Sequence, residues 1–155
     1  KAEKGLQLPA PTQVPPGMKL PFSWVRVVGN RAFVSGHGPV NPDGSLAQPL
    51  GKLGDTDTVE QGYSAARLTA LGMLASLKRE LGDLERIAAW ARVFGMVNCT
   101  PDFKQQPQVI IGCSDLILEL FGPERGNHAR SAVGMMSLPL SIPVEIEAEE
   151  NLWGE

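Results

Sequence analysis

The sequence predicts an α+β fold in which two helices cover one face of a single mixed β-sheet. Runs of β-forming residues and two long amphipathic segments follow one another in the order β-β-α-β-α-β-β. Each amphipathic segment has one apolar stripe, so both are expected to pack on the same side of the sheet. A chain of 155 residues is long enough to build one domain with its own core.

The N-terminal part of the chain predicts an arm followed by a β-hairpin. Residues 1–21 contain five prolines and little periodicity, which indicates an extended arm lying on the surface. Residues 24–28 and 31–35 are rich in β-formers, and the Gly-Asn pair at 29–30 is typical of a two-residue hairpin turn. We expect the glycine-rich residues 36–39 to break the second strand.

The middle of the chain predicts a long helix and a buried strand. Thr58 and Gln61 have the spacing of a capping box, so a helix should begin there and continue to Leu81, with Gly82 ending it. Residues 87–97 are almost continuously apolar, which favours a strand that is buried on both faces.

A second helix is predicted over residues 107–121, followed by a polar loop at 122–127 and by two strands on either side of residues 138–143. If those two strands formed a simple hairpin, Glu145 would lie opposite Met136, about 20 Å along the strand from Arg130. Arg130 and Glu145 can then meet only if the strands are not neighbours or if a pocket forms between subunits.

Composition argues against several classes of protein. The net charge of −3 and the pI near 5.4 disfavour a dedicated nucleic-acid binder. No stretch approaches the roughly 18 uncharged apolar residues of a membrane span, and we expect no secretion leader. Cys99 and Cys113 lack a metal-binding or CxxC spacing, so we expect reduced thiols in a cytoplasmic protein, without a metal or an organic cofactor.

Arg130 is the first candidate for chemistry. It is followed by seven uncharged residues, 131–137, so its cation stands alone beside apolar strands. A guanidinium group is planar and permanently charged, and it can bind a carboxylate through two hydrogen bonds. The alternative is an arginine at the start of a strand that pairs with a surface acid.

Three acids alternate along the last strand at Glu145, Glu147 and Glu149, so they share one face. Such a file of like charges is usually a hydrated surface. Glu145 is the candidate exception, because cover by a second subunit would desolvate it and raise its pKa. It could then hold or deprotonate a water molecule.

Two histidines and one serine complete the candidates. His37 and His128 both lie in glycine-containing loops, where each is either a general acid/base or a histidine without a catalytic role. Ser35 lacks the sequence around a nucleophilic serine, so its hydroxyl is expected to bond a ligand or a strand end. Gly36, His37 and Gly38 precede no helix and therefore form no phosphate loop.

Four motifs follow one another along the chain. They are Phe33-Val34-Ser35-Gly36-His37-Gly38-Pro39, His128-Ala129-Arg130-Ser131-Ala132-Val133, Leu138-Pro139 and Val144-Glu145-Ile146-Glu147-Ala148. Together they resemble the RidA family, also called YjgF or endoribonuclease L-PSP, and the resemblance covers about residues 20–150.

The resemblance implies a chorismate-mutase-like fold that assembles as a homotrimer with clefts at the subunit interfaces. It also implies a 2-iminobutanoate/2-iminopropanoate deaminase-like hydrolase, which converts reactive enamines and imines to a 2-oxo acid and ammonia. By resemblance Arg130 clamps the carboxylate of a small metabolite and Glu145 positions the attacking water. Ser35, Gly36 and His37 line the pocket, and the backbone around Ala132 lends polar groups.

The chain also departs from the pattern of the active family members. Phe22 replaces a tyrosine, Ala132 replaces a cysteine, and Ser114 is the nearest counterpart of an asparagine on the second helix. These changes leave open a noncatalytic trimer that binds small carboxylates. An endoribonuclease or translation inhibitor is disfavoured by the acidic pI and by the lack of a basic, aromatic surface.

Overall fold

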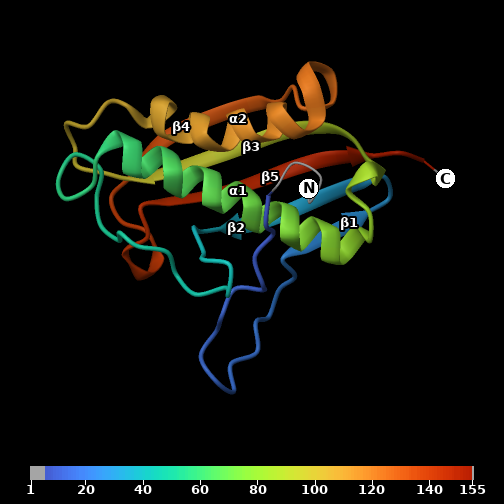
Figure 1. Ribbon diagram of the computed structural model, residues 1–155, viewed down its shortest axis with the longest axis horizontal. Coiled ribbons are helices and arrows are strands. Elements are labelled where there is room, and N and C mark those ends of the chain that lie inside the picture. The colour runs from blue at the N-terminus through green and yellow to red at the C-terminus, as the bar shows by residue number, and fades with distance from the viewer. Residues whose placement is uncertain (1–5, 155) are drawn as a thin grey trace.

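The computed structural model describes residues 6–154, so the first five residues of the predicted arm lie outside the described part (Figure 1). The predicted order of strands and helices is confirmed. The strands and helices are β1 (Val25–Val28), β2 (Arg31–His37), α1 (Val59–Leu81), β3 (Ile87–Asn98), α2 (Gln106–Arg125), β4 (Ala129–Met135) and β5 (Val144–Leu152), with short 3-10 helices η2 (Leu84–Arg86) and η3 (Pro139–Ser141).

The sheet is mixed and has the strand order β1-β2-β5-β3-β4. Strands β3 and β4 are parallel, and the other neighbouring pairs are antiparallel. Helices α1 and α2 lie on the same side of the sheet, as predicted, and within residues 6–154 no helix covers the other side (Figure 1). Neither α1 nor α2, nor any other helix within residues 6–154, is long and apolar enough to cross a membrane.

The core fills the space between the sheet and the two helices. Helices α1 and α2 approach each other closely at Gly112, where a Cβ atom would lie 2.1 Å from the carbonyl oxygen of Tyr63. Side chains that are fully buried in this layer include Met73, Leu74, Leu77, Val93, Val97, Ile110, Leu116, Ile117, Val144 and Ile146.

The local predictions for the first half of the chain are largely confirmed. Strands β1 and β2 form a hairpin that turns between Val28 and Arg31. The side chain of Thr58 accepts from the backbone N–H of Gln61, and the helix ends before Gly82, whose φ is +84°. Strand β2 ends at His37, within the residues 36–39 that were predicted to break it, and its pairing with β5 is already irregular between Val34 and His37.

The second helix also differs slightly from its prediction. Its regular part ends at Phe121, where Gly122 takes a φ of +83°. The chain then makes a further turn as far as Arg125, so residues 122–127 are not a simple loop as predicted.

Strand β3 is buried on one face only, which contradicts the prediction that both of its faces are covered. Val93 and Val97 are 0% exposed beneath the helices. Arg92, Phe94 and Met96 alternate with them and point to the side of the sheet that has no helix.

The last two strands do not form a hairpin. Strand β4 is the outer neighbour of β3, whereas β5 lies between β2 and β3. The connection therefore passes over the end of β3, where the backbone N–H of Asn98 donates to Pro143 O at 2.9 Å and its side-chain amide donates to Ile142 O at 3.2 Å. Arg130 and Glu145 are consequently on strands that are not neighbours.

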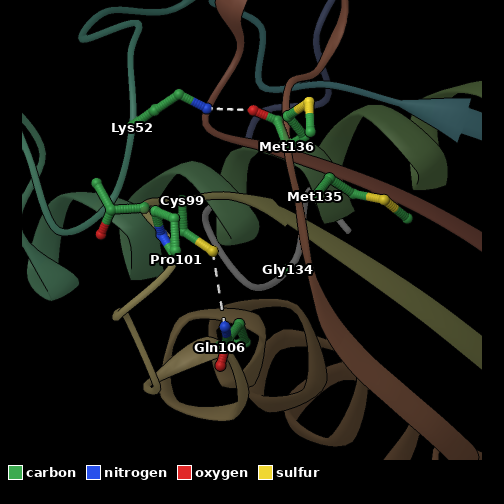
Figure 2. Close-up of a pocket in the computed structure, with 8 residues that line it drawn as sticks. Lys52, Cys99, Pro101, Gln106, Gly134, Met135 and Met136 are labelled. Atoms are coloured by element: carbon green, nitrogen blue, oxygen red, sulfur yellow. Dashed lines mark hydrogen bonds between the residues drawn. The ribbon is translucent and has the colours of Figure 1, made fainter.

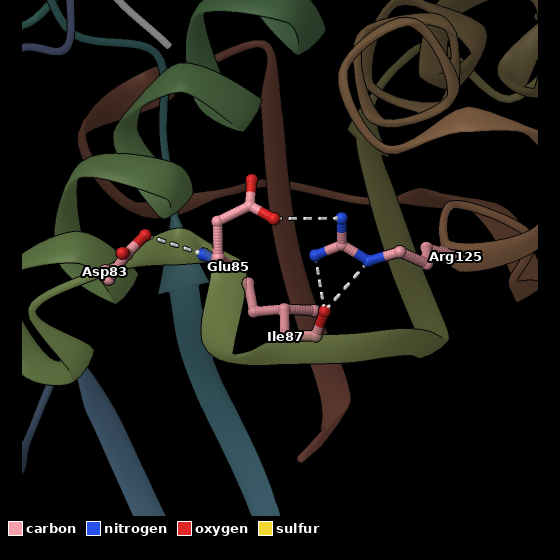
Figure 3. A network of polar contacts seen from close by, with 4 residues as sticks. All are labelled: Asp83, Glu85, Ile87 and Arg125. Carbon is pink, nitrogen blue, oxygen red and sulfur yellow. Dashed lines mark hydrogen bonds and ion pairs between the residues drawn. The ribbon is translucent and has the colours of Figure 1, made fainter.

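A polar network fastens the end of α2 to the start of β3 (Figure 3). Arg125 donates to the carbonyl oxygen of Ile87 through Nε at 3.1 Å and Nη2 at 2.6 Å, and it pairs with Glu85 at 3.5 Å. Asp83 accepts from the backbone N–H of Glu85 at 2.9 Å. This network fixes the position from which the chain enters β4.

Glu150 places a carboxyl group inside the core. It is 0% exposed, and neither of its carboxyl oxygens has a hydrogen-bond partner within residues 6–154. Trp90 is its neighbour across the strands, and the indole N–H of Trp90 is also buried without a hydrogen-bond partner within residues 6–154. Burial, with a smaller contribution from the charge of Glu149, raises the pKa of Glu150 well above its ordinary value.

We expect Glu150→Gln to stabilise the protein by an amount that grows with pH. The unfolded chain loses the Glu150 proton near its ordinary pKa of 4.5, whereas the folded chain keeps it to higher pH. The stability that this proton contributes is thus complete below pH 4.5 and is lost as the pH rises toward the folded-state pKa. Glutamine cannot ionise and avoids this loss.

Urea unfolding of both proteins over this pH range measures the difference. Glu124→Gln, at an exposed glutamate, is the control and should follow the wild type. A constant difference between Glu150→Gln and the wild type at every pH would contradict the expectation.

Candidate functional site

The predicted site residues fall into two clusters in the folded chain. The arginine cluster consists of Ser114 on α2, Arg130 and Ala132 on β4, and His128 in the connection just before β4. The carboxylate cluster consists of Ser35, Gly36 and Glu145, on β2 and β5.

Arg130 lies on the outer strand of the sheet and points to the helix side. Its register partner is the buried Val93, and its Nη1 donates to the hydroxyl oxygen of Ser114 at 3.2 Å. Within residues 6–154 it has no ion-pair partner. The guanidinium therefore keeps an uncompensated charge and has donors left for a ligand.

His128 joins this cluster through the same serine. Its Nε2 lies 2.9 Å from Ser114 Oγ and its Nδ1 lies 2.7 Å from Gly126 O. The consistent assignment has Nδ1 donating to the carbonyl, Nε2 accepting from the serine hydroxyl, and the serine oxygen accepting from Arg130.

This chain of bonds holds the arginine, and the sequence predictions did not assign it. The available signal was that His128 stands two residues before Arg130, so the two share one face of an extended strand. The partnership of both residues with Ser114 depends on how α2 packs, and no spacing in the sequence reports it.

Ala132 follows on the same face of β4 and packs partly against the core. Its methyl group offers no chemistry. Because β4 is an edge strand, however, every second backbone amide and carbonyl along it points away from β3 and stays available to a ligand or a neighbouring chain.

Glu145 points to the side of the sheet that has no helix. Its neighbours Val144 and Ile146 are fully buried on the helix side, and the side chains of a strand alternate. Its carboxylate lies over Gly36, where a Cβ atom would be 2.1 Å from Glu145 Oε2. Partial burial, and then the charge of Glu147, raise the pKa of Glu145.

Ser35 belongs to the carboxylate cluster, and Phe22 directly precedes Ser23, the residue to which the Ser35 hydroxyl donates. The hydroxyl of Ser35 donates to Ser23 O at 2.7 Å and can still accept a hydrogen bond through its oxygen. Phe22 is 52% exposed and stands edge-on to Trp24, with ring centroids 5.5 Å apart.

His37, predicted to line the pocket, is buried beneath α1. Its Nδ1 lies 2.6 Å from Ser35 O and its Nε2 lies 2.8 Å from Ser76 Oγ, so both ring nitrogens are occupied. Burial lowers the pKa of His37 to about 4, which keeps the ring neutral at neutral pH. The ring supports the strand that carries Ser35 and Gly36, and it does not face Glu145.

The two clusters lie on opposite faces of one sheet. Arg130 points to the helix side on β4, and Glu145 points to the other side on β5, with β3 between the two strands. A single subunit therefore cannot bring the guanidinium and the carboxylate to one small ligand.

Other reactive groups are few in the described part of the chain. Within residues 6–154 no group of three or more His, Cys, Asp or Glu could hold a metal ion. Cys99 and Cys113 are both free thiols. Cys113 is 0% exposed, and burial raises its pKa to about 12.

Comparison with known proteins agrees with this fold. The sequence pattern of the YjgF/chorismate mutase-like, putative endoribonuclease family matches residues 3–146. The chain belongs to this family. Protein TCP17 of Trypanosoma cruzi is 42% identical over 120 residues, which make up 77% of this chain and 74% of TCP17.

Several solved structures share this fold. A putative endoribonuclease from Shewanella oneidensis MR-1 is 32% identical, with a TM-score of 0.86 and coverage of 97% of this chain and 95% of that one. Atu1372 of Agrobacterium tumefaciens, of unknown function, is 38% identical, with a TM-score of 0.80 and coverage of 88% and 86%. E. coli TdcF, solved with bound serine, shares the fold at 19% identity and a TM-score of 0.61, over 96% of each chain.

We expect Glu147→Gln to lower the pKa of Glu145, because it removes the neighbouring charge that helps to raise it. Burial of Glu145 remains, so part of the upward shift should persist. Carbon-13 NMR titration of labelled glutamate carboxyls, assigned with Glu145→Gln, measures the change. Glu149→Gln is the matched control, since Glu149 lies on the same face but pairs with Arg31 at 2.8 Å. An unchanged Glu145 pKa in Glu147→Gln would contradict the expectation that the charge of Glu147 helps to raise it.

Proposed function

We propose that this YjgF protein hydrolyses small 2-imino acids, and the enamines that tautomerise to them, to 2-oxo acids and ammonia at a site between two subunits. The observation that carries the proposal is the separation of Arg130 and Glu145 on opposite faces of the sheet. Arg130 carries a charge that lacks an ion-pair partner within residues 6–154, and Glu145 carries a partly desolvated carboxylate. The two groups are complementary halves of such a site.

In this proposal Arg130 binds the substrate carboxylate. Ser114 and His128 hold its guanidinium from behind and leave its remaining donors free to form two parallel bonds to the anion. The edge of β4 near Ala132 supplies backbone groups beside the imine. The substrate is thus fixed by its anionic end, with its C=N carbon turned toward the neighbouring subunit.

Glu145 of that neighbour activates the water. Its carboxylate accepts a proton as the water oxygen forms a bond to the carbon of the protonated imine, which gives a neutral carbinolamine. Glu145 returns that proton to the nitrogen. The C–N bond then breaks and ammonia leaves, while the hydroxyl gives its proton to the Glu145 carboxylate and becomes the carbonyl of the 2-oxo acid. Glu145 finally passes this proton to the departing ammonia, which leaves as ammonium. An upward shift of the Glu145 pKa favours a group that must both take and return a proton.

The assembly in this proposal is a ring of three copies. The arginine cluster and the carboxylate cluster occupy different surfaces, so joining them is a head-to-tail contact, and such contacts close into rings. The side of the sheet without a helix carries Phe33, Phe94, Met96 and Val133 next to the acids, and a neighbouring copy would cover this apolar strip. The trimer follows from the family resemblance, and free thiols at Cys99 and Cys113 support a cytoplasmic location.

A noncatalytic trimer that binds small carboxylates is the second candidate. Phe22 and Ala132 favour it, because neither side chain offers a hydroxyl or thiol to the reaction. Ribonuclease activity, named for the family and for the Shewanella relative, has least support here, since the net charge is −3.

Ammonia release from freshly generated 2-aminoacrylate tests the activity. We expect Arg130→Ala to lower kcat/KM by roughly 10- to 100-fold, because it removes the charge-assisted hydrogen bonds to the substrate carboxylate. Arg67→Ala, which removes a guanidinium that pairs with Glu119 on the outer helix surface, should leave it unchanged. Carboxylate binding that depends on Arg130 without any ammonia release would favour the noncatalytic candidate.

Mixed oligomers test the shared site directly. Alone, Arg130→Ala should keep at most about a tenth of the wild-type activity and Glu145→Gln should be inactive. Refolding equal amounts of the two together should raise the activity to about a quarter of the wild-type value, because one interface in four then joins an intact Arg130 to an intact Glu145. No recovery in oligomers shown to be mixed would contradict a site that is built from two subunits.

A further inference from the structure

A well-formed cavity lies away from both clusters, where β3 and β4 end and α2 begins (Figure 2). Its volume is about 540 Å³, within the range of sites that hold small molecules. Arg130 does not line it, and Gly134, which does, is four residues farther along β4, or about 13 Å. The lining residues are Lys52, Cys99, Thr100, Pro101, Gln106, Gly134, Met135 and Met136.

Lys52 gives this cavity a fixed positive charge. Its ammonium group donates to the side-chain oxygen of Asn98 at 2.7 Å and to the backbone oxygen of Met136. Both acceptors are neutral, no acid is among the lining residues, and within residues 6–154 the lysine has no ion-pair partner. One N–H of the ammonium group therefore remains for a ligand.

The rest of the cavity is mainly apolar and depends on a glycine. Met135, Met136 and Pro101 supply hydrophobic surface, and methionine side chains adapt readily to a ligand's shape. A Cβ atom at position 134 would lie 2.8 Å from Cys99 Sγ and 3.1 Å from Gln106 Nε2, so any side chain there would push into the space between them. Figure 2 shows Lys52 and Gln106 entering from opposite sides with Cys99 between them.

We propose that this cavity is a second binding site, distinct from the Arg130 site, for a small organic anion with an apolar body. Lys52 binds the anionic group, and the methionine and proline surface covers the hydrocarbon part. The proposal rests on the cavity and on the Lys52 ammonium group that lacks an ion-pair partner within residues 6–154. It does not depend on whether the protein hydrolyses imines.

The two cysteines provide the test. Cys99 lines the cavity, so iodoacetamide that enters the cavity should alkylate it. Cys113 is 0% exposed and does not line the cavity, so it should stay unlabelled and report that the protein is folded. We expect hexanoate to slow Cys99 labelling at least about fivefold in a saturable way, as one unscreened charge pair would allow. Hexanamide, which has the same body without the charge, should protect far less.

Variants locate the bound hexanoate. Lys52→Met and Gly134→Ala should abolish protection, while Lys52→Arg, which keeps the charge, and Lys104→Met, at an exposed lysine outside the cavity, should retain it. Arg130→Ala should also retain protection, whatever it does to ammonia release. Equal protection by hexanoate and hexanamide, loss of protection in Arg130→Ala, or failure of Cys99 to react in the free protein would each overturn the proposal.

Discussion

The architecture depends on a sheet that is covered by helices on one face only. Side chains of a strand alternate, so each strand sends one set of residues into the core and the other set to the uncovered face. Arg130 falls in the first set and Glu145 in the second, although both belong to the same C-terminal part of the chain. Their separation is fixed by the pleat of the sheet and cannot be removed by side-chain rotation.

Each half of the proposed site is held by packing that lies behind it. Arg125 ties the end of α2 to Ile87, and α2 in turn presents Ser114 to Arg130. On the other half, the buried His37 supports β2, which brings Gly36 beneath the Glu145 carboxylate. The charged groups can therefore stay partly exposed while their geometry is set by buried neighbours.

Burial also assigns different roles to groups that titrate. Glu150 and His37 are enclosed, so burial favours their uncharged forms and makes them part of the core. Glu145 is only half-buried, so its pKa rises while its carboxylate stays within reach of a ligand. The ammonium group of Lys52 lies at a separate cavity, where it donates to the side-chain oxygen of Asn98 and to the backbone oxygen of Met136.

Local sequence determined the elements of this protein, and contacts between distant residues decided how they combine. The hairpin turn at 29–30 and the Thr58 cap need only neighbouring residues, and both were predictable. The order of the strands was not predictable from local sequence, because it depends on a short connection that is held by Asn98. This connection places β5 between β2 and β3 and leaves β4 at the edge. The sequence alone could name Arg130 and Glu145, but only the packed sheet decided that they face opposite ways, since the face of a strand depends on which side its helices cover.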